Sequence, residues 1–162
     1  MTISLNWKFV SSHPAHFIAC GFGVGLFPRA PGTAGTLLAF PFFWLLKDVS
    51  SVGLYLLVVA ALFALGAWAG EKTNQALGVA DHSAIVWDEV VAFLLVLYFT
   101  PPTWAWYFAA FLLFRLFDIW KPFPIRYFDH RLKNGWGVMF DDLLAGVYTV
   151  MVIKILERIF FA

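Results

Sequence analysis

Cysteine and charge are scarce in this chain. Its 162 residues include one cysteine, Cys20, which excludes disulfide frameworks, cysteine-rich zinc sites and iron–sulfur clusters. Charged residues make up 13% of the chain, about half of their share in an ordinary soluble domain. The 11 basic and 10 acidic residues nearly cancel, so the net charge of +1 provides no field that would recruit nucleic acid. A nucleic-acid-binding function is therefore excluded.

Apolar residues are abundant instead. They form 62% of the chain, against roughly 45–50% in soluble domains, and 20% of the residues are aromatic. Aromatic rings accumulate at both interfaces of a bilayer. The stretch before His16 has one lysine and no continuous apolar run, so we expect no cleavable signal peptide. We find no repeat or linker, and expect a single membrane domain over residues 1–162.

Five apolar segments predict the helices of this domain. Val52 to Ala69 is uncharged and long enough to cross a bilayer, and Leu143 to Ala162 should also span, with charges only near its far end. The shorter segments are Thr36 to Leu46, Val90 to Phe99 and Trp104 to Phe114. Two prolines between the last two segments predict a helical hairpin. We expect an all-α, compact, membrane-embedded bundle with about five membrane-associated segments.

Alternating segments would divide the polar residues between two faces. The connections at 47–51 and 100–103 and the C-terminal end then share one side, and most basic residues lie on the other side. By the positive-inside bias, the basic side is cytoplasmic.

Most carboxylates fall on the same predicted cytoplasmic side. An aspartate at the centre of a spanning helix costs about 2.5–3.5 kcal/mol, so these groups should lie in the headgroup layer or turn into the bundle. Converging carboxylates repel one another unless a hard divalent cation compensates them. The sequence therefore predicts a Mg²⁺ site at the cytoplasmic interface, from among Asp81, Asp88, Glu89, Asp118, Asp141 and Asp142.

Local patterns favour convergence. Asp88 with Glu89, and Asp141 with Asp142, are each predicted at the start of a helix, where the helix dipole favours negative charge. Small residues one turn after Asp142, at 145 and 146, allow another helix to approach closely.

Charges also recur at Arg115, Asp118 and Lys121, which can share one helix face. This pattern fits a phosphate site coupled to a metal, and fits an interfacial salt-bridge ladder equally well.

The remaining polar candidates are less specific. His82 can act as an acid or base near neutral pH, or be an ordinary loop residue. Arg29 and Thr33 precede or begin a predicted helix whose free amides can bind an anion, although simple helix-start chemistry explains them as well. His13 and His16 are interpreted as interfacial polar residues rather than metal ligands.

Four blocks of the chain are distinctive in sequence and in order. They are GFGVGLFPRAPGTAGT (Gly21 to Thr36), DHSAIVWDEVVAF (Asp81 to Phe93), FRLFDIWKPFPI (Phe114 to Ile125) and GWGVMFDDLLAGV (Gly135 to Val147). Together they resemble the phosphatidylglycerophosphatase A family of bacterial Mg²⁺-dependent enzymes, which dephosphorylate phosphatidylglycerophosphate to phosphatidylglycerol. The resemblance extends over nearly all the chain from Gly21 onward.

The resemblance implies a helical lipid phosphatase in the bacterial cytoplasmic membrane, acting in phospholipid biosynthesis. It implies that Mg²⁺ is held by Asp88, Glu89, Asp118, Asp141 and Asp142. Three basic residues, Arg29, Arg115 and Lys121, would hold the terminal phosphate, with Thr33 beside them at the helix start. Asp88, Asp118, Asp141 and His82 are then the candidate catalytic residues. Attack by an activated water and a covalent aspartyl phosphate both remain open as routes.

Two other function classes are alternatives. A small ion or metal carrier would place acids along the depth of its helices. Four of the predicted segments, from Val52 to Ala69, Val90 to Phe99, Trp104 to Phe114 and Leu143 to Ile153, contain no acid, which favours a surface site. A scaffold for lipid-synthesis enzymes would not need paired acids at two helix entrances.

Overall fold

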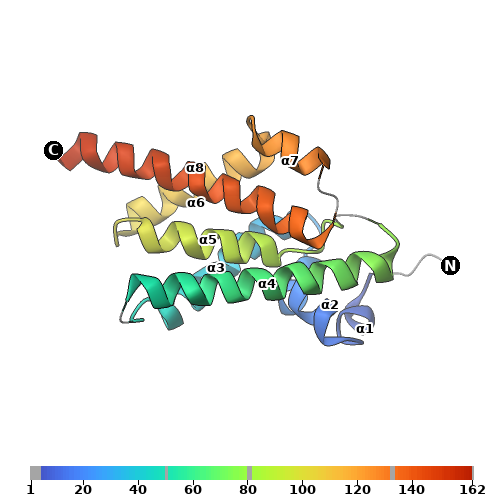
Figure 1. Ribbon diagram of the computed structural model, residues 1–162. Coiled ribbons are helices and arrows are strands. Elements are labelled where there is room, and N and C mark those ends of the chain that lie inside the picture. Colours follow the sequence, from blue (N-terminus) through green and yellow to red (C-terminus); the bar gives the residue numbers. More distant parts are fainter. Residues whose placement is uncertain (1–4, 50, 80–81, 132–133, 162) are drawn as a thin grey trace.

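The computed structural model in Figure 1 describes residues 5–49, 51–79, 82–131 and 134–161. The regular elements in these ranges are all helices, which confirms the predicted all-α fold. They are α1 (Trp7–Val10), α2 (Pro14–Ala19), the 3-10 helix η1 (Gly21–Leu26), α3 (Pro31–Leu46), α4 (Val52–Leu77), α5 (Trp87–Phe99), α6 (Trp104–Trp120), α7 (Ile125–Arg131) and α8 (Gly135–Phe161).

Helix α5 forms the centre of the bundle. It is apolar on all sides after its first turn, and nearly every side chain from Trp87 to Leu97 is buried. A helix that is hydrophobic all round is stable only when other helices surround it. Helices α3, α4, α6 and α8 pack against α5. The predicted segment Val90 to Phe99 is therefore the core of the molecule.

The long helices alternate in direction, as the sequence predicts. Helices α3, α5 and α8 begin at the end of the bundle where α4 terminates and where α6 leads into α7, on the right in Figure 1. The end of α3, the start of α4, the connection at 100–103 and the end of α8 lie at the opposite end. We call the first end the acidic end, because it carries Asp88, Glu89, Asp118, Asp141 and Asp142.

Helix α4 has the properties of a membrane-crossing helix. Among the described helices it alone is both long and apolar enough to cross a bilayer, and 28% of its most apolar stretch is buried inside the molecule. Side chains such as Leu54, Leu57 and Trp68 face outward. Helix α8 contains residues 143–161 of the other predicted span, Leu143 to Ala162, whose last residue lies outside the described residues, and has charged side chains at both ends of its apolar run. Helix α3 is apolar but shorter.

Helix α8 begins earlier than its apolar segment predicts. Its first residue is Gly135, and a side chain there would collide with the carbonyl oxygen of Ala67 in α4. Asp141 and Asp142 therefore lie about two turns inside the helix. It is therefore wrong that they lie at the helix start and are stabilised there by the helix dipole. The apolar segment ends at these two charged residues, but the helix extends beyond them to Gly135.

The glycine-rich segment before α3 is a tight turn, as predicted. Gly21, Phe22 and Gly23 have φ angles of +54°, +59° and +98°, a region that glycine adopts readily. The turn places the start of α3 against the acidic end of the bundle.

Candidate functional site

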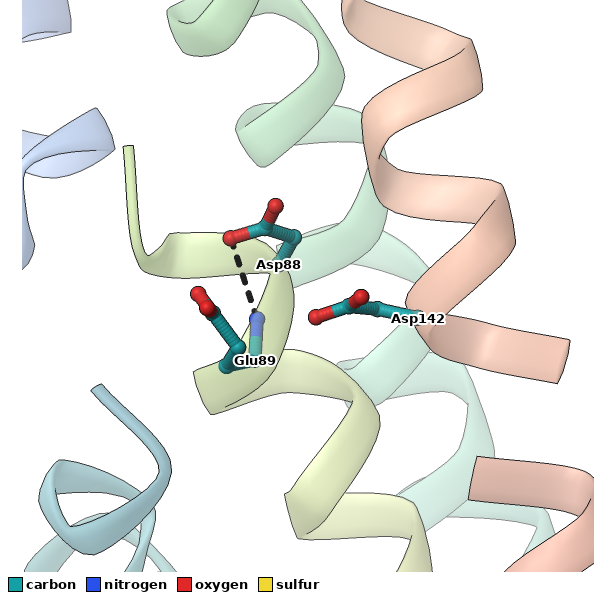
Figure 2. Close-up of side chains that lie close together, drawn as sticks. All are labelled: Asp88, Glu89 and Asp142. Carbon is teal, nitrogen blue, oxygen red and sulfur yellow. Dashed lines mark hydrogen bonds between the residues drawn. The ribbon is translucent and has the colours of Figure 1, made fainter. Parts of the chain in front are cut away.

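Three carboxylates converge at the acidic end of the bundle. One oxygen each from Asp88, Glu89 and Asp142 lies within 4.8 Å of the others. Figure 2 shows Asp142 extending from α8 toward the first turn of α5, which carries the other two acids. Asp88 and Asp142 are buried, and the Glu89 side chain is 12% exposed. We call these three residues the carboxylate cluster.

Close packing of α5 against α8 brings the cluster together. Ala145 is fully buried. A Cβ added at Gly146 would lie 3.2 Å from the carbonyl oxygen of Ala92 in α5. The predicted close approach at these small residues is therefore confirmed, and it places Asp142, one turn earlier in α8, opposite Asp88 and Glu89.

Arg115 of α6 is a cation in contact with the cluster. Its Nη1 lies 2.7 Å from Oδ2 of Asp118 and 3.6 Å from Oε1 of Glu89. The same nitrogen lies 3.4 Å from Oγ1 of Thr36 in α3. Asp118 and Glu89 thus contact the same guanidinium nitrogen, which joins Asp118 to the cluster. The Nε of Arg115 is buried and makes no hydrogen bond within the described structure.

The start of α3 lies against this guanidinium. A Cβ added at Gly32 would collide with Oε1 of Glu89 and lie 3.2 Å from both terminal nitrogens of Arg115. Only glycine permits this approach. No side chain caps the helix at Ala30, so the first backbone N–H groups of α3 are available to a ligand. An anion bound here would meet these amides and Arg115 together.

Lys121 pairs with Asp141 rather than extending the row of charges on α6. It ends α6 in a left-handed conformation with φ +47°, and its Nζ forms an ion pair with Oδ2 of Asp141 in α8. The i, i+3 pair of Arg115 and Asp118 is present as predicted.

The cluster is electrostatically strained in the absence of a cation. Burial raises the pKa of Glu89 to about 7, and the charge of Asp118 adds to this rise while Asp88 and Arg115 oppose it. Burial also raises the pKa of Asp142 well above its ordinary value, with further repulsion from Asp118, Asp88, Glu89 and Asp141. Glu89 Oε2 and Asp142 Oδ2 are buried without a hydrogen-bond partner among the described residues.

Three candidates from the sequence make no hydrogen bond or ion pair with the cluster among the described residues. Arg29 is exposed in the turn before α3 and makes no ion pair within the described ranges. Thr33 is half-buried, and Thr36 rather than Thr33 contacts Arg115. His82 accepts the backbone N–H of Ala84 at Nδ1 in the loop before α5. Asp81 lies outside the described residues.

The paired histidines have structural contacts. His13 accepts the N–H of Ala15 and caps α2, whereas His16 is buried, stacks on Phe9 and hydrogen-bonds Thr73 at 3.0 Å. His16 is thus a core residue, and the interfacial interpretation is wrong for it.

Two residues at this end were not singled out by the sequence. Gly32 belongs to the predicted helix start, and only the packing identifies it as the point of contact with Glu89. Glu71 has no feature in the sequence that distinguishes it from an ordinary solvated acid. Its Oε2 accepts the N–H of Gly135 at 2.8 Å and so caps α8, the helix that carries Asp142.

The site combines carboxylates, which can bind a metal ion, with hydrogen-bond donors, which can bind an anion. Carboxylate oxygens are the ligands that hard divalent cations prefer, while a guanidinium and free helix amides bind phosphate oxygens. The protein is thus a helical bundle whose site has the groups needed to hold both a divalent cation and a phosphate.

Comparisons with known proteins identify the family. The profile of the family Phosphatidylglycerophosphatase A matches residues 17–157. The chain is 48% identical to Phosphatidylglycerophosphatase A of Haemophilus influenzae over 142 residues, 87% of each protein. It is 44% identical to Phosphatidylglycerophosphatase A of Escherichia coli over 137 residues, 84% of this chain and 79% of the relative. The chain belongs to the phosphatidylglycerophosphatase A family.

A third relative has a different name. A protein of Bacteroides thetaiotaomicron, provisionally named a phosphatidylinositol-3-phosphatase, is 43% identical over 145 residues, 85% of this chain and 90% of the relative. No solved structure matches the chain. The ion or metal carrier receives no support from these relatives, all of which are named as phosphatases.

Proposed function

We propose that the protein is a Mg²⁺-dependent lipid phosphatase, which hydrolyses the terminal phosphate monoester of phosphatidylglycerophosphate to give phosphatidylglycerol and phosphate. The observation that carries this proposal is the convergence of Asp88, Glu89 and Asp142 beside Arg115 and the uncapped start of α3. The family relationship supplies the substrate, because two relatives are named for it.

The residues of the cluster fit a divalent cation. Buried carboxylates stay ionised only when they are compensated, and two of these side chains have a buried oxygen without a partner among the described residues. Asp88, Glu89 and Asp142 would hold the ion, with Asp118 and Asp141 next to them. When bound, Mg²⁺ would polarise the phosphoryl group and neutralise developing charge.

The side chains around the cluster suit the binding of a phosphate monoester. Arg115 and the first amides of α3 can donate to the phosphoryl oxygens, and Lys121 adds a second positive charge. Asp118 and Asp141 hold these two cations in place through their ion pairs. Arg29 and Thr33, at the same helix start, are further candidates for contact with the headgroup.

Hydrolysis requires a proton acceptor and a proton donor. Asp88 is our candidate acceptor, because it lies in the first turn of α5, where the helix dipole favours its ionised form. The oxygen of an attacking water would bond to phosphorus while the water gives a proton to Asp88, the phosphorus–oxygen bond to glycerol would break, and the glycerol oxygen would take up a proton. His82 is a candidate donor in its doubly protonated form, in which Nδ1 gives up the hydrogen bond that it accepts here from Ala84 and the ring becomes neutral once the glycerol oxygen is protonated. A covalent aspartyl phosphate is the competing route.

We also propose that the acidic end faces the cytoplasm in a multi-pass arrangement in the bacterial inner membrane. Helix α4 supports a membrane location through its exposed apolar side chains. The predominance of basic residues at the acidic end supports the orientation. The substrate phosphate would then need to reach only the headgroup layer.

The test is phosphate release by the purified protein in detergent micelles. We expect release from phosphatidylglycerophosphate with Mg²⁺, no release in EDTA, and recovery when Mg²⁺ is restored. Asp142→Asn should abolish turnover, whereas Asp48→Asn, an exposed residue at the opposite end, should not change it. Full activity in EDTA would contradict the metal, and near-normal activity of Asp142→Asn would remove this residue from the site.

Substrate selectivity needs parallel assays. Phosphatidic acid carries its phosphate monoester directly on diacylglycerol, whereas phosphatidylinositol 3-phosphate carries one on an inositol ring. The name of the Bacteroides relative is the reason for testing the inositol lipid. We expect phosphatidylglycerophosphate to have the highest kcat/KM. A preference for the inositol lipid would retain the phosphatase mechanism and change the substrate.

A further inference from the structure

An apolar groove runs along the bundle between α3 and α6. Its volume is about 500 Å³. Helix α3 contributes Leu37, Phe40 and Trp44, while α6 contributes Tyr107, Phe108 and Phe111, with Trp104 at the outer end. Apart from the hydroxyl of Tyr107, these side chains have no oxygen, and the indole N–H groups are the only other polar atoms. Nothing that we have assigned to phosphate chemistry lies in this groove.

Aromatic rings from three helices shape the groove. Phe93 of the central helix α5 lies behind it, with its ring 5.7 Å from that of Phe40 and 6.2 Å from that of Phe111. At the far end, the rings of Trp44 and Trp104 approach to 5.6 Å and join the two walls. Helices α3 and α6 both pack on α5, so the groove is a fixed feature of the fold.

One end of the groove adjoins the phosphate-binding residues. Leu37 directly follows Thr36, and Phe111 precedes Arg115 by about one helical turn. Thr36 and Arg115 are themselves 3.4 Å apart, so the same two helices hold the guanidinium and then continue as the groove walls. From Leu37 to Trp44 the groove extends for about 10 Å along α3, away from the acidic end.

The groove is also open along its length. Leu37 is 51% exposed and Phe108 is 64% exposed, so apolar surface would face outward if nothing covered it. Burial of this surface by an apolar ligand is favourable, and elongated apolar clefts next to a few polar groups are typical ligand sites. Tryptophan is enriched where a lipid bilayer meets water, so the two tryptophans suit the level at which the far end of the groove would reach the bilayer surface.

We propose that this groove holds one acyl chain of the lipid whose phosphate lies at the carboxylate cluster. The inference rests on the proposed function, because it treats the cluster as the phosphate site. The acyl chain would extend from beside Thr36 and Arg115, over Phe40 and Phe111, to the tryptophan pair. The enzyme would then recognise its substrate by the chain as well as by the headgroup.

A matched pair of variants tests the groove by activity. Leu37→Trp fills its entrance, whereas Leu45→Trp makes the same change on α3 at a residue that is 81% exposed and does not line the groove. We expect Leu37→Trp to lower the ratio of kcat/KM for dipalmitoyl over dibutyryl phosphatidylglycerophosphate by about tenfold, or ~1.4 kcal/mol. Leu45→Trp should leave the ratio unchanged. An unchanged ratio in both variants would overturn the proposal.

A binding experiment on the unaltered protein does not require turnover. Dipalmitoyl phosphatidylglycerophosphate with a diazirine in one chain is photolysed in micelles with the protein, and the adducts are mapped by mass spectrometry. We expect adducts at Trp44, Tyr107, Phe108 or Phe111 that unlabelled phosphatidylglycerophosphate suppresses and phosphatidylcholine does not.

The outcomes separate the groove from the proposed function. Groove adducts without phosphate release from any lipid would retain the groove and reject the phosphatase. Phosphate release with adducts spread over the exposed face of α4 would retain the phosphatase and reject the groove. A groove without adducts, as expected if a second copy of the chain covers it, would also reject the proposal, as would adducts that both competitors suppress equally.

Discussion

Replacing Gly32 with alanine should separate activity from stability. The added Cβ would collide with Oε1 of Glu89 and lie 3.2 Å from both terminal nitrogens of Arg115. Both neighbours are side-chain ends, which can move by an ångström without unfolding the bundle. Alanine also favours the helix over glycine by up to about 1 kcal/mol. The free energy of unfolding should therefore change by less than about 1 kcal/mol.

The same displacement should be costly for the reaction. A misplacement of about 1 Å in a catalytic group can reduce the rate by about 100-fold, and Gly32→Ala displaces the two groups that connect the carboxylate cluster to the phosphate-binding residues. We expect kcat/KM for phosphate release to fall by about 100-fold, while the melting temperature in detergent changes by no more than a few degrees.

The control is Gly53→Ala in α4, where an added Cβ meets no atom within 4 Å. This variant should retain full activity. Activity of Gly32→Ala within twofold of the unaltered protein would refute the assigned position of α3 against the site.

Three further predictions follow from the same end of the bundle. Glu71→Ala removes the cap on the N–H of Gly135 and should lower the free energy of unfolding by about 1 kcal/mol, a fall of about 2–4 °C in melting temperature. The control Glu157→Ala, in an exposed ion pair, should lower the melting temperature far less. Equal effects of the two variants would contradict the cap. Asp142→Asn should raise the melting temperature of the metal-free protein, because it removes a buried carboxylate repelled by four others; a lower value would contradict this repulsion. Burial raises the pKa of Glu89 from 4.5 to about 7. Between these two pH values the folded metal-free protein retains a proton that the unfolded chain loses, so the stability of the folded protein should fall as the pH rises from about 4.5 to about 7. Added Mg²⁺ should accordingly raise the melting temperature more at about pH 8 than at about pH 5.5, and the reverse order would contradict the role of Glu89.

The five longest helices, α3, α4, α5, α6 and α8, were predictable because each contains an apolar run, whereas the short helices α1, α2 and α7 contain no such run and were not predicted. Trp104 to Phe114 and the paired prolines before it define the hairpin of α5 and α6. The start of α8 was not predictable in this way, because its first two turns are held by Glu71 and by packing against Ala67 rather than by hydropathy. Contacts between distant residues decide where such a helix begins.

The sequence could predict which acidic residues converge at the site, but not which basic residue each of them pairs with. Adjacent acids in an apolar chain have few stable locations, so Asp88, Glu89 and Asp142 could be expected to converge. The spacing of Arg115, Asp118 and Lys121 predicted a single row, whereas the left-handed end of α6 directs Lys121 to Asp141. Such pairings depend on how α6 and α8 pack, which no local pattern in the sequence records.

Binding of Mn²⁺, as a spectroscopic substitute for Mg²⁺, tests the central claim most directly. Electron paramagnetic resonance of the purified protein in detergent reports free and bound Mn²⁺ without any requirement for turnover. We predict bound Mn²⁺ that Mg²⁺ displaces, with a Kd at least about tenfold higher for Asp142→Asn and unchanged for Asp48→Asn. Equal Mn²⁺ affinity in the unaltered protein and Asp142→Asn, or no bound Mn²⁺ at all, would contradict a cation site at the carboxylate cluster.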